Sequence, residues 1–386
     1  MQRLAVETIT NEAGLVALEP EWVALEAASG NTLPFRTAAW TSSWWAHLRQ
    51  TRRALRDVLA VRAVRTDAGR LVGVAPMMVT ERPGAGPFAV RCLQFMGTDP
   101  NVTELRGPLF LPELEEACFR AVADDVARDS ARWDWTVWSG VPRTGTSAAL
   151  LESGGVTWTR EIPSYVLPLT GDWAAFKTAL PRNVKESLRK CYNAPKRDGL
   201  ALAFEVVTDP ADVPGAVEDL FRLHSARALL EGTIRHGDVF ADEGVRSFML
   251  DVCGRLARRG VTRIFRLRIG DAVVATRIGF ALNDCLYLYY SGFDPAFGKY
   301  SVMTTTVAEA IQYAFTEGFA SVNLSTGTDV SKTRWNPEER MHFEGEQESP
   351  KVRGRVAHGA FRLATLALEH PRIAQYAQKL SRRSGA

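Results

Sequence analysis

The stretch that decides the fold consists of RIFRLRI (Arg263–Ile269), AVVATRIGFAL (Ala272–Leu282) and CLYLYYSG (Cys285–Gly292). Each run is rich in β-branched or aromatic residues, and the pairs Gly270-Asp271 and Asn283-Asp284 separate the runs with turn-forming residues. Such runs with short polar breaks are typical of antiparallel hairpins. We therefore predict three consecutive antiparallel strands.

A loop, a helix and a fourth strand follow these three strands. The loop is FDPAFGKYS (Phe293–Ser301), apolar residues then recur at helical spacing from Met303 to Phe315, and Val322–Ser325 alternates like a strand. A helix entered directly from a strand presents its unpaired amide groups to whatever lies beyond the strand end. Ser301 is a reasonable N-cap with Lys299 beside it, so the pattern predicts either an anion site or an ordinary connection with a solvated lysine. The GxxxxGK[ST] pattern of a phosphate-binding Walker loop does not occur.

The segment YLYYSGFDPAFGKYSVMTTTVAEAIQYAFTEGFASVNLSTGTDVSKTRW resembles the C-terminal half of GNAT-type acyltransferases of the CelD-like group. The matching motifs are Gly292-Phe293-Asp294-Pro295 and the run from Gly327 through Lys332 to Trp335. Leu71–Pro83 and Leu93–Asn101 are similar to two N-terminal motifs of the same group. The resemblance extends from about Trp40 to Trp335 and implies an acyltransferase that uses acetyl-CoA or another acyl-CoA as co-substrate.

The resemblance also leaves a second donor open. The chain has Val302-Met303 where the CelD-like group often has glycine. The related Fem-type transferases, which use aminoacyl-tRNA, also lack this glycine. A glycine at this position lets the backbone approach a pyrophosphate closely.

The same order of elements occurs twice along the chain. The N-terminal half contains predicted strands at Asp57–Thr66, Leu71–Thr80 and Arg91–Gly97, a helix at Glu113–Asp129 and a strand at Trp133–Ser139. The fold class is therefore α/β with two similar domains, and the resemblance implies tandem GNAT-like domains whose central sheets are mixed, mostly antiparallel and flanked by helices. We predict an N-terminal domain over residues 1–165, a C-terminal domain with the donor site over 166–345 and a helical extension over 346–386.

The N-terminal domain lacks the features of an anion site. Its third strand is followed by TDPNVTELRGPLFLP, whose Asp-Pro and Gly-Pro pairs predict a loop instead of a helix start. We interpret this domain as a structural or acceptor-binding half. The remaining segments are predicted as a connecting strand at Pro163–Trp173, helices at Leu180–Gly199, Val213–Glu231 and Asp238–Arg259, a loop at Asn336–Gly354, and a helix at His358–Leu380 broken at Pro371.

Two of these helices carry features of interest. The helix at Leu180–Gly199 has a basic face with Arg182, Lys185 and Arg189, which is either solvated or faces a phosphate-bearing donor. The helix at His358–Leu380 is a candidate packing helix or homodimer contact, with membrane-surface binding as a lesser alternative.

Composition limits the choice of partners and compartment. The 386 residues are 46% apolar and 24% charged with a net charge of +3, a balance too mild to indicate DNA or a membrane surface. No apolar run approaches the roughly 20 residues of a transmembrane segment, and the N-terminus lacks a signal core, so we expect a cytoplasmic protein. The five cysteines and six histidines form no metal-binding spacing, so we predict no metal.

Transfer of an acyl group needs a general base, an acid for the leaving group and an oriented carbonyl. The candidate bases are His224, Asp294 and Asp329, and the candidate acids are Tyr300 and Ser301. A structural role for His224 stays open, since a lone helical histidine is often buried and satisfied. The backbone of Tyr289, Tyr290 and Ser291 is predicted to polarise the donor carbonyl. The sequence has no Ser-His-Asp arrangement or GxSxG elbow, so we expect no covalent acyl-enzyme.

The predicted ligand contacts complete the candidate site. Lys299, Ser301 and Val302 are predicted to bind the donor. The resemblance carries an H-x-x-R pair to His224 and Arg227, and Arg227 is assigned to a donor phosphate or an acceptor carboxylate. Lys332 and Arg334 follow the last strand and are predicted to bind a carboxylate or phosphate, with simple solvation as the alternative.

Three classes of function follow. The leading hypothesis is an acyl-CoA-dependent N- or O-acyltransferase that acts on a small-molecule or saccharide acceptor, such as an amino sugar, a polysaccharide or a natural-product precursor. The alternatives are an aminoacyl-tRNA-dependent Fem-type transferase and a non-catalytic GNAT-like binding protein.

Overall fold

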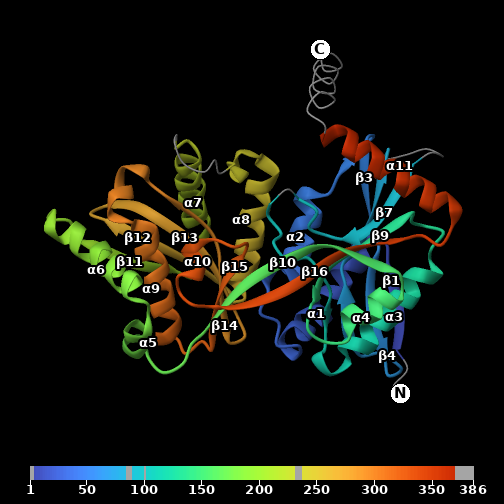
Figure 1. The fold of residues 1–386 in the computed structure, drawn as a ribbon, viewed down its shortest axis with the longest axis horizontal. Helices are drawn as coiled ribbons and strands as arrows, with labels where there is room; N and C mark the ends of the chain where they lie inside the picture. The colour runs from blue at the N-terminus through green and yellow to red at the C-terminus, as the bar shows by residue number, and fades with distance from the viewer. Residues whose placement is uncertain (1–3, 84–88, 100, 231–236, 370–386) are drawn as a thin grey trace, which may run out of the picture.

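The computed structural model describes residues 4–83, 89–99, 101–230 and 237–369. The N-terminal and C-terminal halves of the chain lie side by side, and two long strands, β10 and β16, cross between them (Figure 1). The elements of the N-terminal half are β1 (Leu4–Ile9), α1 (Glu12–Ala28), η1 (Pro34–Arg36), α2 (Ala38–Leu48), β2 (Thr51–Arg52), β3 (Leu55–Leu59), β4 (Val61–Thr66), β5 (Leu71–Ala75), β6 (Met77–Arg82), β7 (Val90–Phe95), β8 (Leu109–Phe110), η2 (Pro112–Leu114), α3 (Glu115–Arg128), β9 (Trp135–Pro142), α4 (Ser147–Ser153) and β10 (Val156–Pro168).

The C-terminal half repeats this plan with a different connection after its third antiparallel strand. Its elements are α5 (Trp173–Ala179), α6 (Arg182–Arg197), β11 (Leu202–Val207), α7 (Val213–Ala228), η3 (Val239–Ala241), α8 (Glu243–Arg258), β12 (Thr262–Ile269), β13 (Ala272–Leu282), β14 (Cys285–Phe293), η4 (Pro295–Tyr300), α9 (Val302–Thr316), β15 (Ser321–Thr326), α10 (Val330–Thr333), β16 (Glu338–Glu348) and α11 (Val352–Glu369).

A twelve-stranded sheet runs through both halves in the order β11-β12-β13-β14-β15-β10-β16-β9-β7-β6-β3-β2. Among the strand pairs of the described residues, β14–β15 and β7–β9 are parallel and the others are antiparallel. A smaller sheet has the order β1-β4-β5-β8. The large sheet has the same order of parallel and antiparallel pairs from either edge, with one parallel pair on each side of the central strands β10 and β16. This confirms the predicted α/β fold class, with two similar halves that each have a mixed, mostly antiparallel sheet.

The two halves exchange their last strands. β10 ends the N-terminal half but pairs with β15, whereas β16 ends the C-terminal half but pairs with β9. The two exchanged strands also pair with each other, from Val156–Gln347 to Val166–Glu338. The predicted domain limits at residues 165 and 345 fall inside these two strands, and we retain that division only as a proposal.

The prediction of a loop over Asn336–Gly354 is wrong, because β16 occupies most of that segment. The sequence of β16, EERMHFEGEQE, lacks an apolar alternation, and most of its side chains are partly or fully exposed. Its backbone is satisfied by partners on both edges. Pairing between distant segments, not local hydrophobicity, therefore makes this segment a strand.

The predicted strand–strand–strand–loop–helix–strand order is confirmed as β12, β13, β14, η4, α9 and β15. The predicted N-terminal hairpin differs from the structure. Each of its strands breaks once, at Ala60 and at Pro76, so that β4 and β5 pair in the small sheet while β3 and β6 join the large one. Proline has no amide hydrogen to donate and cannot continue a ladder on both sides, which explains the break at Pro76.

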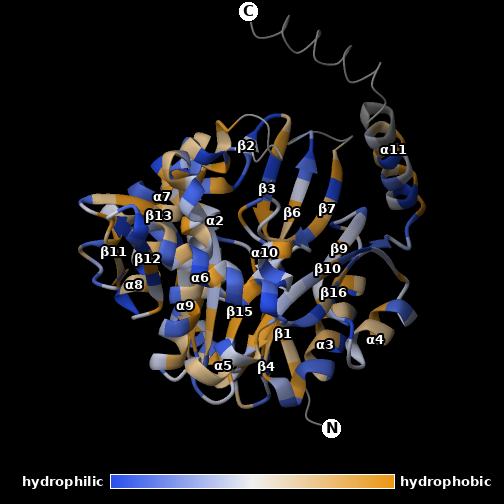
Figure 2. Cartoon of the chain, turned by 60° about the vertical axis from the view of Figure 1, so that its left-hand side comes forward, coloured by the Kyte–Doolittle hydropathy of each residue, from blue (hydrophilic) through white to orange (hydrophobic). Residues whose placement is uncertain are grey.

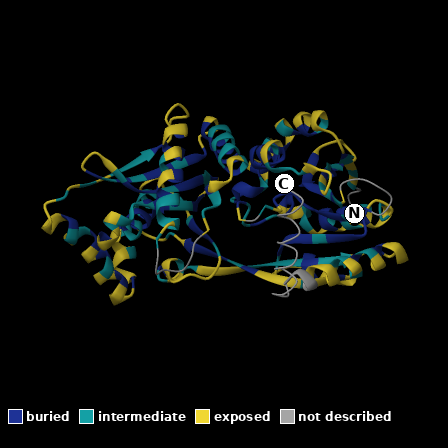
Figure 3. Cartoon of the chain, turned by 90° about the horizontal axis from the view of Figure 1, so that it is seen from above, coloured by how far each residue is buried: buried dark blue, intermediate teal, exposed yellow. Residues whose placement is uncertain are grey.

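The core lies between the sheets and the helices that cover them. Apolar residues gather on the strands and on the inner faces of the helices (Figure 2), and buried residues follow the sheet while exposed ones lie on the outer helices (Figure 3). Trp40 and Trp44 of α2 are both 2% exposed, so this pair forms a packed helix face. Helix α11 begins earlier than predicted, and the predicted break at Pro371 lies outside the described residues.

Candidate active site

Strands β14 and β15 separate after three paired positions. Their parallel ladder joins Cys285 to Ser321 and ends where Tyr287 lies opposite Asn323. Beyond this point β14 continues to Phe293 while β15 leaves the ladder and ends at Thr326. A cavity of about 330 Å³ opens beyond the diverging strands, beside the start of α9. We call it the basic cavity, and its lining includes Arg227, Arg277, Ser291, Ser301, Met303 and Arg334.

The N-terminal end of α9 forms one wall of the basic cavity. Ser301 adopts a left-handed conformation (φ 54°), and its side chain makes no capping hydrogen bond. The amides of Thr304 and Thr305 donate to the Ser301 carbonyl, so those of Val302 and Met303 precede the first helical bonds. A helix directs such early amides out of its N-terminal end, and its dipole favours an anion there. The first turn of α9 contains no acidic residue.

Three arginines from separate elements complete the basic cavity. Arg227 comes from α7, Arg277 from β13, and Arg334 from the end of α10. Burial lowers the pKa of Arg277 to about 10, which leaves its guanidinium charged at neutral pH, and burial also lowers the pKa of Arg227. The Arg277 Nε atom is buried with no hydrogen-bond partner among the described residues. A phosphate-bearing ligand would neutralise such clustered guanidinium groups.

The two residues of the predicted H-x-x-R pair have different surroundings: Arg227 lines the basic cavity, whereas His224 is packed against β14. Arg227 lines the basic cavity with its guanidinium 6.0 Å from the Phe293 ring centroid. His224 is 6% exposed, and its Nδ1 lies 3.1 Å from the Ser291 carbonyl oxygen. Its ring packs edge-on against Tyr290, and its Nε2 has no hydrogen-bond partner among the described residues. His224 therefore contacts the backbone of β14 at Ser291. Its role as a base stays a prediction.

Both predicted aspartate bases cap short helical segments. Asp294 accepts a hydrogen bond from the Ala296 amide (2.9 Å) at the start of η4. Asp329 accepts one from the Ser331 amide (2.6 Å) at the start of α10, and hydrogen bonding to Ser331 lowers its pKa. Neither residue is part of the cavity lining that the structure describes. These caps give both residues a structural role, and their use as bases stays a prediction.

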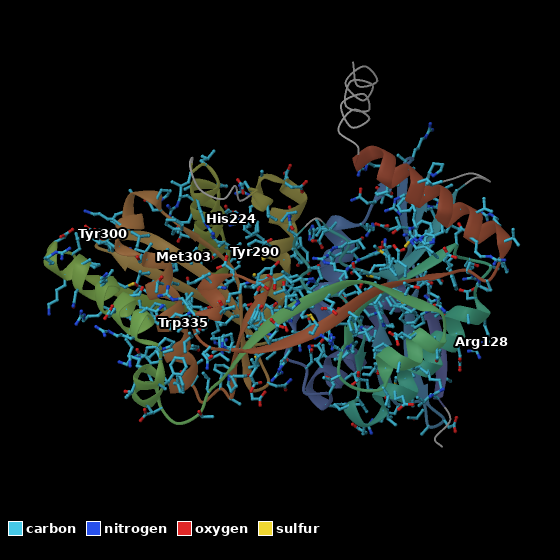
Figure 4. The ribbon with its side chains drawn as sticks, in the orientation of Figure 1. Arg128, His224, Tyr290, Tyr300, Met303 and Trp335 are labelled. Carbon is cyan, nitrogen blue, oxygen red and sulfur yellow. The ribbon has the colours of Figure 1, made fainter. Side chains whose placement is uncertain are left out.

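Lys299 and Tyr300 point towards the end of α6. The Tyr300 hydroxyl donates to Asp198 (2.8 Å), and the Lys299 Nζ lies 3.4 Å from the same carboxylate. Figure 4 shows His224 and Tyr290 on one side of Met303 and Tyr300 on the other. Of the two predicted acids, Ser301 lines the basic cavity and Tyr300 does not belong to its described lining.

The three residues predicted to orient a carbonyl lie where β14 runs past the end of its ladder with β15. Tyr289 is buried and its hydroxyl donates to the Val102 carbonyl, while Ser291 lines the basic cavity. Tyr290 faces a second cavity on the other side of β14. The Lys332 ammonium donates to the Thr326 carbonyl at the end of β15, and burial lowers its pKa.

A residue that the sequence analysis missed lies at the centre of this arrangement. Glu104, from the N-terminal half, accepts a hydrogen bond from the Tyr287 hydroxyl of β14 and one from Ser325 Oγ of β15 (2.8 Å). Burial raises the pKa of its carboxyl group, opposed by these hydrogen bonds. Glu104 lies within a predicted loop, and no local pattern marks it as functional. Its position depends on contacts across the two halves.

Residues 182–333 match the family model described as "Acetyltransferase (GNAT) domain". The chain contains a GNAT acetyltransferase domain. The matched residues run from α6 to α10 and contain every described lining residue of the basic cavity except Arg334 and Trp335. The GNAT domain thus makes the protein an acyltransferase. No curated protein is similar enough in sequence to match the chain.

Solved structures share the fold at low sequence identity. FemX is 10% identical, with a TM-score of 0.58 over 88% of this chain and 96% of FemX. The C-terminal domain of a putative lysylphosphatidylglycerol synthetase from Agrobacterium fabrum is 14% identical, with a TM-score of 0.52 over 92% of this chain and 97% of that domain. A conserved protein of unknown function from Bacteroides thetaiotaomicron is 14% identical, with a TM-score of 0.50 over 89% and 100% of the two chains. At these identities the likeness establishes the fold alone.

In the described ranges, no group of three or more His, Cys, Asp or Glu side chains is arranged to hold a metal ion. Helices there also lack the combination of length and apolar character that a membrane span requires.

Proposed function

We propose that the protein transfers an acyl group from a coenzyme A thioester directly to an amine or hydroxyl group of an acceptor, such as an amino sugar, a polysaccharide or a natural-product precursor. The observation that carries the proposal is the basic cavity. It combines the uncapped N-terminus of α9 with Arg227, Arg277 and Arg334, beside strands that separate. Coenzyme A is a polyanion, and helix amides and guanidinium groups are the groups that bind phosphate best.

The thioester carbonyl would then lie along β14 at Tyr289–Ser291, where the backbone has left its ladder with β15. Amide groups held at such a site can stabilise the oxyanion that forms when the acceptor attacks. Orientation of the two reactants supplies much of the rate enhancement, about 7–11 kcal/mol in favourable cases. Ser301 is closer to the proposed donor than Tyr300 and is the better candidate to protonate the leaving thiolate.

The cysteines support direct transfer. All five are buried. Burial raises the pKa of each thiol, to about 12 for Cys118. A thiol nucleophile needs a lowered pKa and access to the donor. An acyl-cysteine intermediate is therefore disfavoured.

Binding of the donor is the test of this proposal. Acetyl-CoA, longer acyl-CoAs and free CoA are titrated into the protein by calorimetry at two salt concentrations. We expect saturable binding that weakens at higher salt, because phosphates and arginines form the contact. Absence of binding for every acyl-CoA would contradict the proposal, and charged tRNA would be the next donor to titrate.

The basic face of α6 favours a tRNA donor as the second candidate. Lys185 and Arg189 line a separate cavity of about 740 Å³ between α5, α6 and α9, beside the aromatic ring of Trp173. The double variant Lys185→Ala/Arg189→Ala separates the two donors. A coenzyme A donor in the basic cavity would keep its affinity within about twofold, whereas a polyanion that follows α6 would lose more and show a smaller salt dependence.

A further inference from the structure

Glu104 bridges the two strands whose separation forms the candidate active site. One of its carboxylate oxygens accepts the hydrogen bond from Tyr287 of β14, and the other accepts the bond from Ser325 of β15. Tyr287 is the last β14 residue in the ladder, and Ser325 lies two positions beyond its partner Asn323. A carboxylate from the N-terminal half thus lies at the point where the strands of the C-terminal half diverge.

The segment that carries Glu104 is firmly held. The hydroxyls of Tyr289 and Tyr290 donate to the carbonyls of Val102 and Asn101, so neighbouring residues of β14 hold the segment that carries Glu104. Asp99 closes the turn from within by accepting amide hydrogen bonds, including one from Thr103 (3.0 Å). Fixed groups of this kind lose little conformational freedom when a ligand binds.

Glu104 also lines a second cavity, of about 580 Å³, on the side of β14 that faces the N-terminal half. We call it the acidic groove, because its charged lining residues are four acids and two bases: Asp99, Glu104, Glu161, Glu344, Arg106 and Arg160. Arg106 is already paired with Glu344. The basic cavity, by contrast, has three arginines and no acid in its described lining. A polyanion is favoured on one side of β14 and a cation on the other.

Glu104 lines the acidic groove but interacts electrostatically with a residue of the basic cavity. Lys332 and Arg277 both act electrostatically on its carboxyl group, and Arg277 belongs to the lining of the basic cavity. Burial raises the pKa of Glu104 against the effect of its hydrogen bonds and of these two cations. A carboxylate with a raised pKa is a stronger base at neutral pH than an exposed one.

We propose that Glu104 is the general base for transfer to a cationic amine that enters through the acidic groove. The inference rests on the proposed use of an acyl-CoA in the basic cavity. Once the ammonium has lost a proton to solvent, the neutral amine attacks the thioester carbonyl. The C–N bond forms, Glu104 accepts the second proton from nitrogen, and the C–S bond breaks. The thiolate gains a proton from the Ser301 hydroxyl, which takes one back from water, and Glu104 returns its proton to solvent, so the products are an amide and free CoA.

This assignment makes the site incomplete without the N-terminal half. The donor side is built from elements of the C-terminal half, whereas the base arrives on the segment that follows β7. It also favours N-transfer over O-transfer, because an acidic groove attracts an ammonium group and a carboxylate can deprotonate the attacking amine.

The test compares Glu104→Gln with the wild-type protein, using acetyl-CoA as donor and ethanolamine as the probe amine. Release of the CoA thiol gives the rate, and calorimetry gives the acetyl-CoA affinity. We expect donor affinity to stay within about twofold while kcat/KM for ethanolamine falls by about 10²–10⁴-fold. The part of the wild-type rise with pH that comes from the Glu104 carboxyl should be lost, whereas the part that comes from deprotonation of the ethanolamine ammonium should remain in both proteins. The other titratable or charged groups around Glu104 are Tyr287, Tyr289, Tyr290, Lys332 and Arg277, together with the other charged residues that line the acidic groove: Asp99, Arg106, Arg160, Glu161 and Glu344. Burial raises the pKa of each of the three tyrosines above its ordinary value.

Two additional variants separate catalysis from structure. Glu104→Ala with added formate should recover part of its activity, because formate can occupy the vacated space and accept the proton. Glu113→Gln removes an exposed carboxylate from η2, which follows β8, and should behave as wild type.

The outcomes distinguish the two proposals. Wild-type protein that binds neither acetyl-CoA nor any longer acyl-CoA overturns the proposed function, and with it the reaction assigned to Glu104. Normal binding with no acetylation of ethanolamine above the buffer rate overturns the amine acceptor. Normal binding with an unchanged rate for Glu104→Gln, or a loss that formate does not relieve, overturns Glu104 as the base.

Discussion

The two parallel strand pairs of this molecule have the same topology, but different groups lie where their strands diverge. In the N-terminal half, β7 and β9 pair over three positions that end with Gln94 opposite Val137. In the C-terminal half, β14 and β15 also pair over three positions. β14 and β15 diverge beside a cavity lined by arginines. The space where β7 and β9 diverge is instead filled by the backbone of another segment.

The backbone that fills the N-terminal gap belongs to the segment carrying Glu104. A Cβ atom on Gly140 would overlap the Arg106 carbonyl oxygen, and one on Gly107 would lie 2.9 Å from the Ser139 carbonyl oxygen. Arg36 adds a hydrogen bond to the Gly140 carbonyl (3.1 Å). The helix that follows, α3, has Glu115 and Glu116 in its first turn, which disfavours an anion there. The same topology thus gives an open site in one half and a closed one in the other, and the segment that closes the first contributes a carboxylate to the second.

Gly140→Ala should break the closed gap and is the largest effect we expect. Gly140 has φ +66° and faces the Arg106 carbonyl without room for a side chain. The strain and the displaced backbone should lower the free energy of unfolding by about 2–4 kcal/mol, measured by urea denaturation. Gly145→Ala is the matched control, because Gly145 also has positive φ (+106°) but a Cβ there meets no atom within 4 Å. It should cost about 1–2 kcal/mol, and equal losses in the two variants would contradict close packing in the gap.

Ser301→Asp tests the open site. Ser301 has the left-handed backbone that Asp and Asn tolerate, so the substitution should leave the fold intact. It places a negative charge at the start of α9, where we propose a donor phosphate, and should weaken acetyl-CoA binding at least about tenfold, or about 1.4 kcal/mol.

Ser301→Asn separates charge from shape in this measurement. It adds an amide of similar size without the charge and should keep the affinity within about threefold, or about 0.7 kcal/mol. Equal affinities for the Asp and Asn variants would move the donor phosphates away from α9.

The open half was largely predictable from its sequence because its signals are local. Alternating apolar residues with tight turns specified β12, β13 and β14, and helical spacing specified α9. Ser301 and Val302 were predicted to lie at the start of that helix, and both line the basic cavity. Arg227, Ser291 and Arg334 also lie in this lining as predicted candidates, although their roles stay predictions.

The features that the sequence did not indicate all depend on contacts between distant segments. β16 is a strand because β9 and β10 satisfy its backbone on both edges, and its charged side chains carry no such information. In the sequence, Arg277 is simply one residue of a predicted strand. The cavity that it lines exists only because β14 and β15 diverge beside that strand. Glu104 lies in a loop whose own residues predict nothing beyond a turn. A functional residue supplied by the opposite half of a tandem fold leaves no local pattern.

His342 should make the half with the closed gap sensitive to acid. His342 lies on β16 near Arg36, the residue that bonds the closed gap. Burial and the charge of Arg36 lower its pKa from the ordinary 6.5 to about 4. Above about pH 6.5 the side chain is neutral in both the folded and the unfolded state and contributes no pH dependence. As the pH falls from 6.5 to about 4, the unfolded state binds a proton that the folded state refuses, so stability is lost in this window.

His342→Gln removes this proton and should reduce the loss of stability between pH 6.5 and 4 by about 1–2 kcal/mol, after allowance for solvent screening. Unfolding free energies from urea titrations at several pH values measure it. His47→Gln is the control, because His47 lies on α2 with its Nε2 3.4 Å from an Asp251 oxygen and is not part of the closed gap. Its removal should leave the acid loss unchanged. If both variants reduce the loss equally, the acid sensitivity is not localised at the closed gap, and the contrast between the two strand pairs would then rest on packing alone.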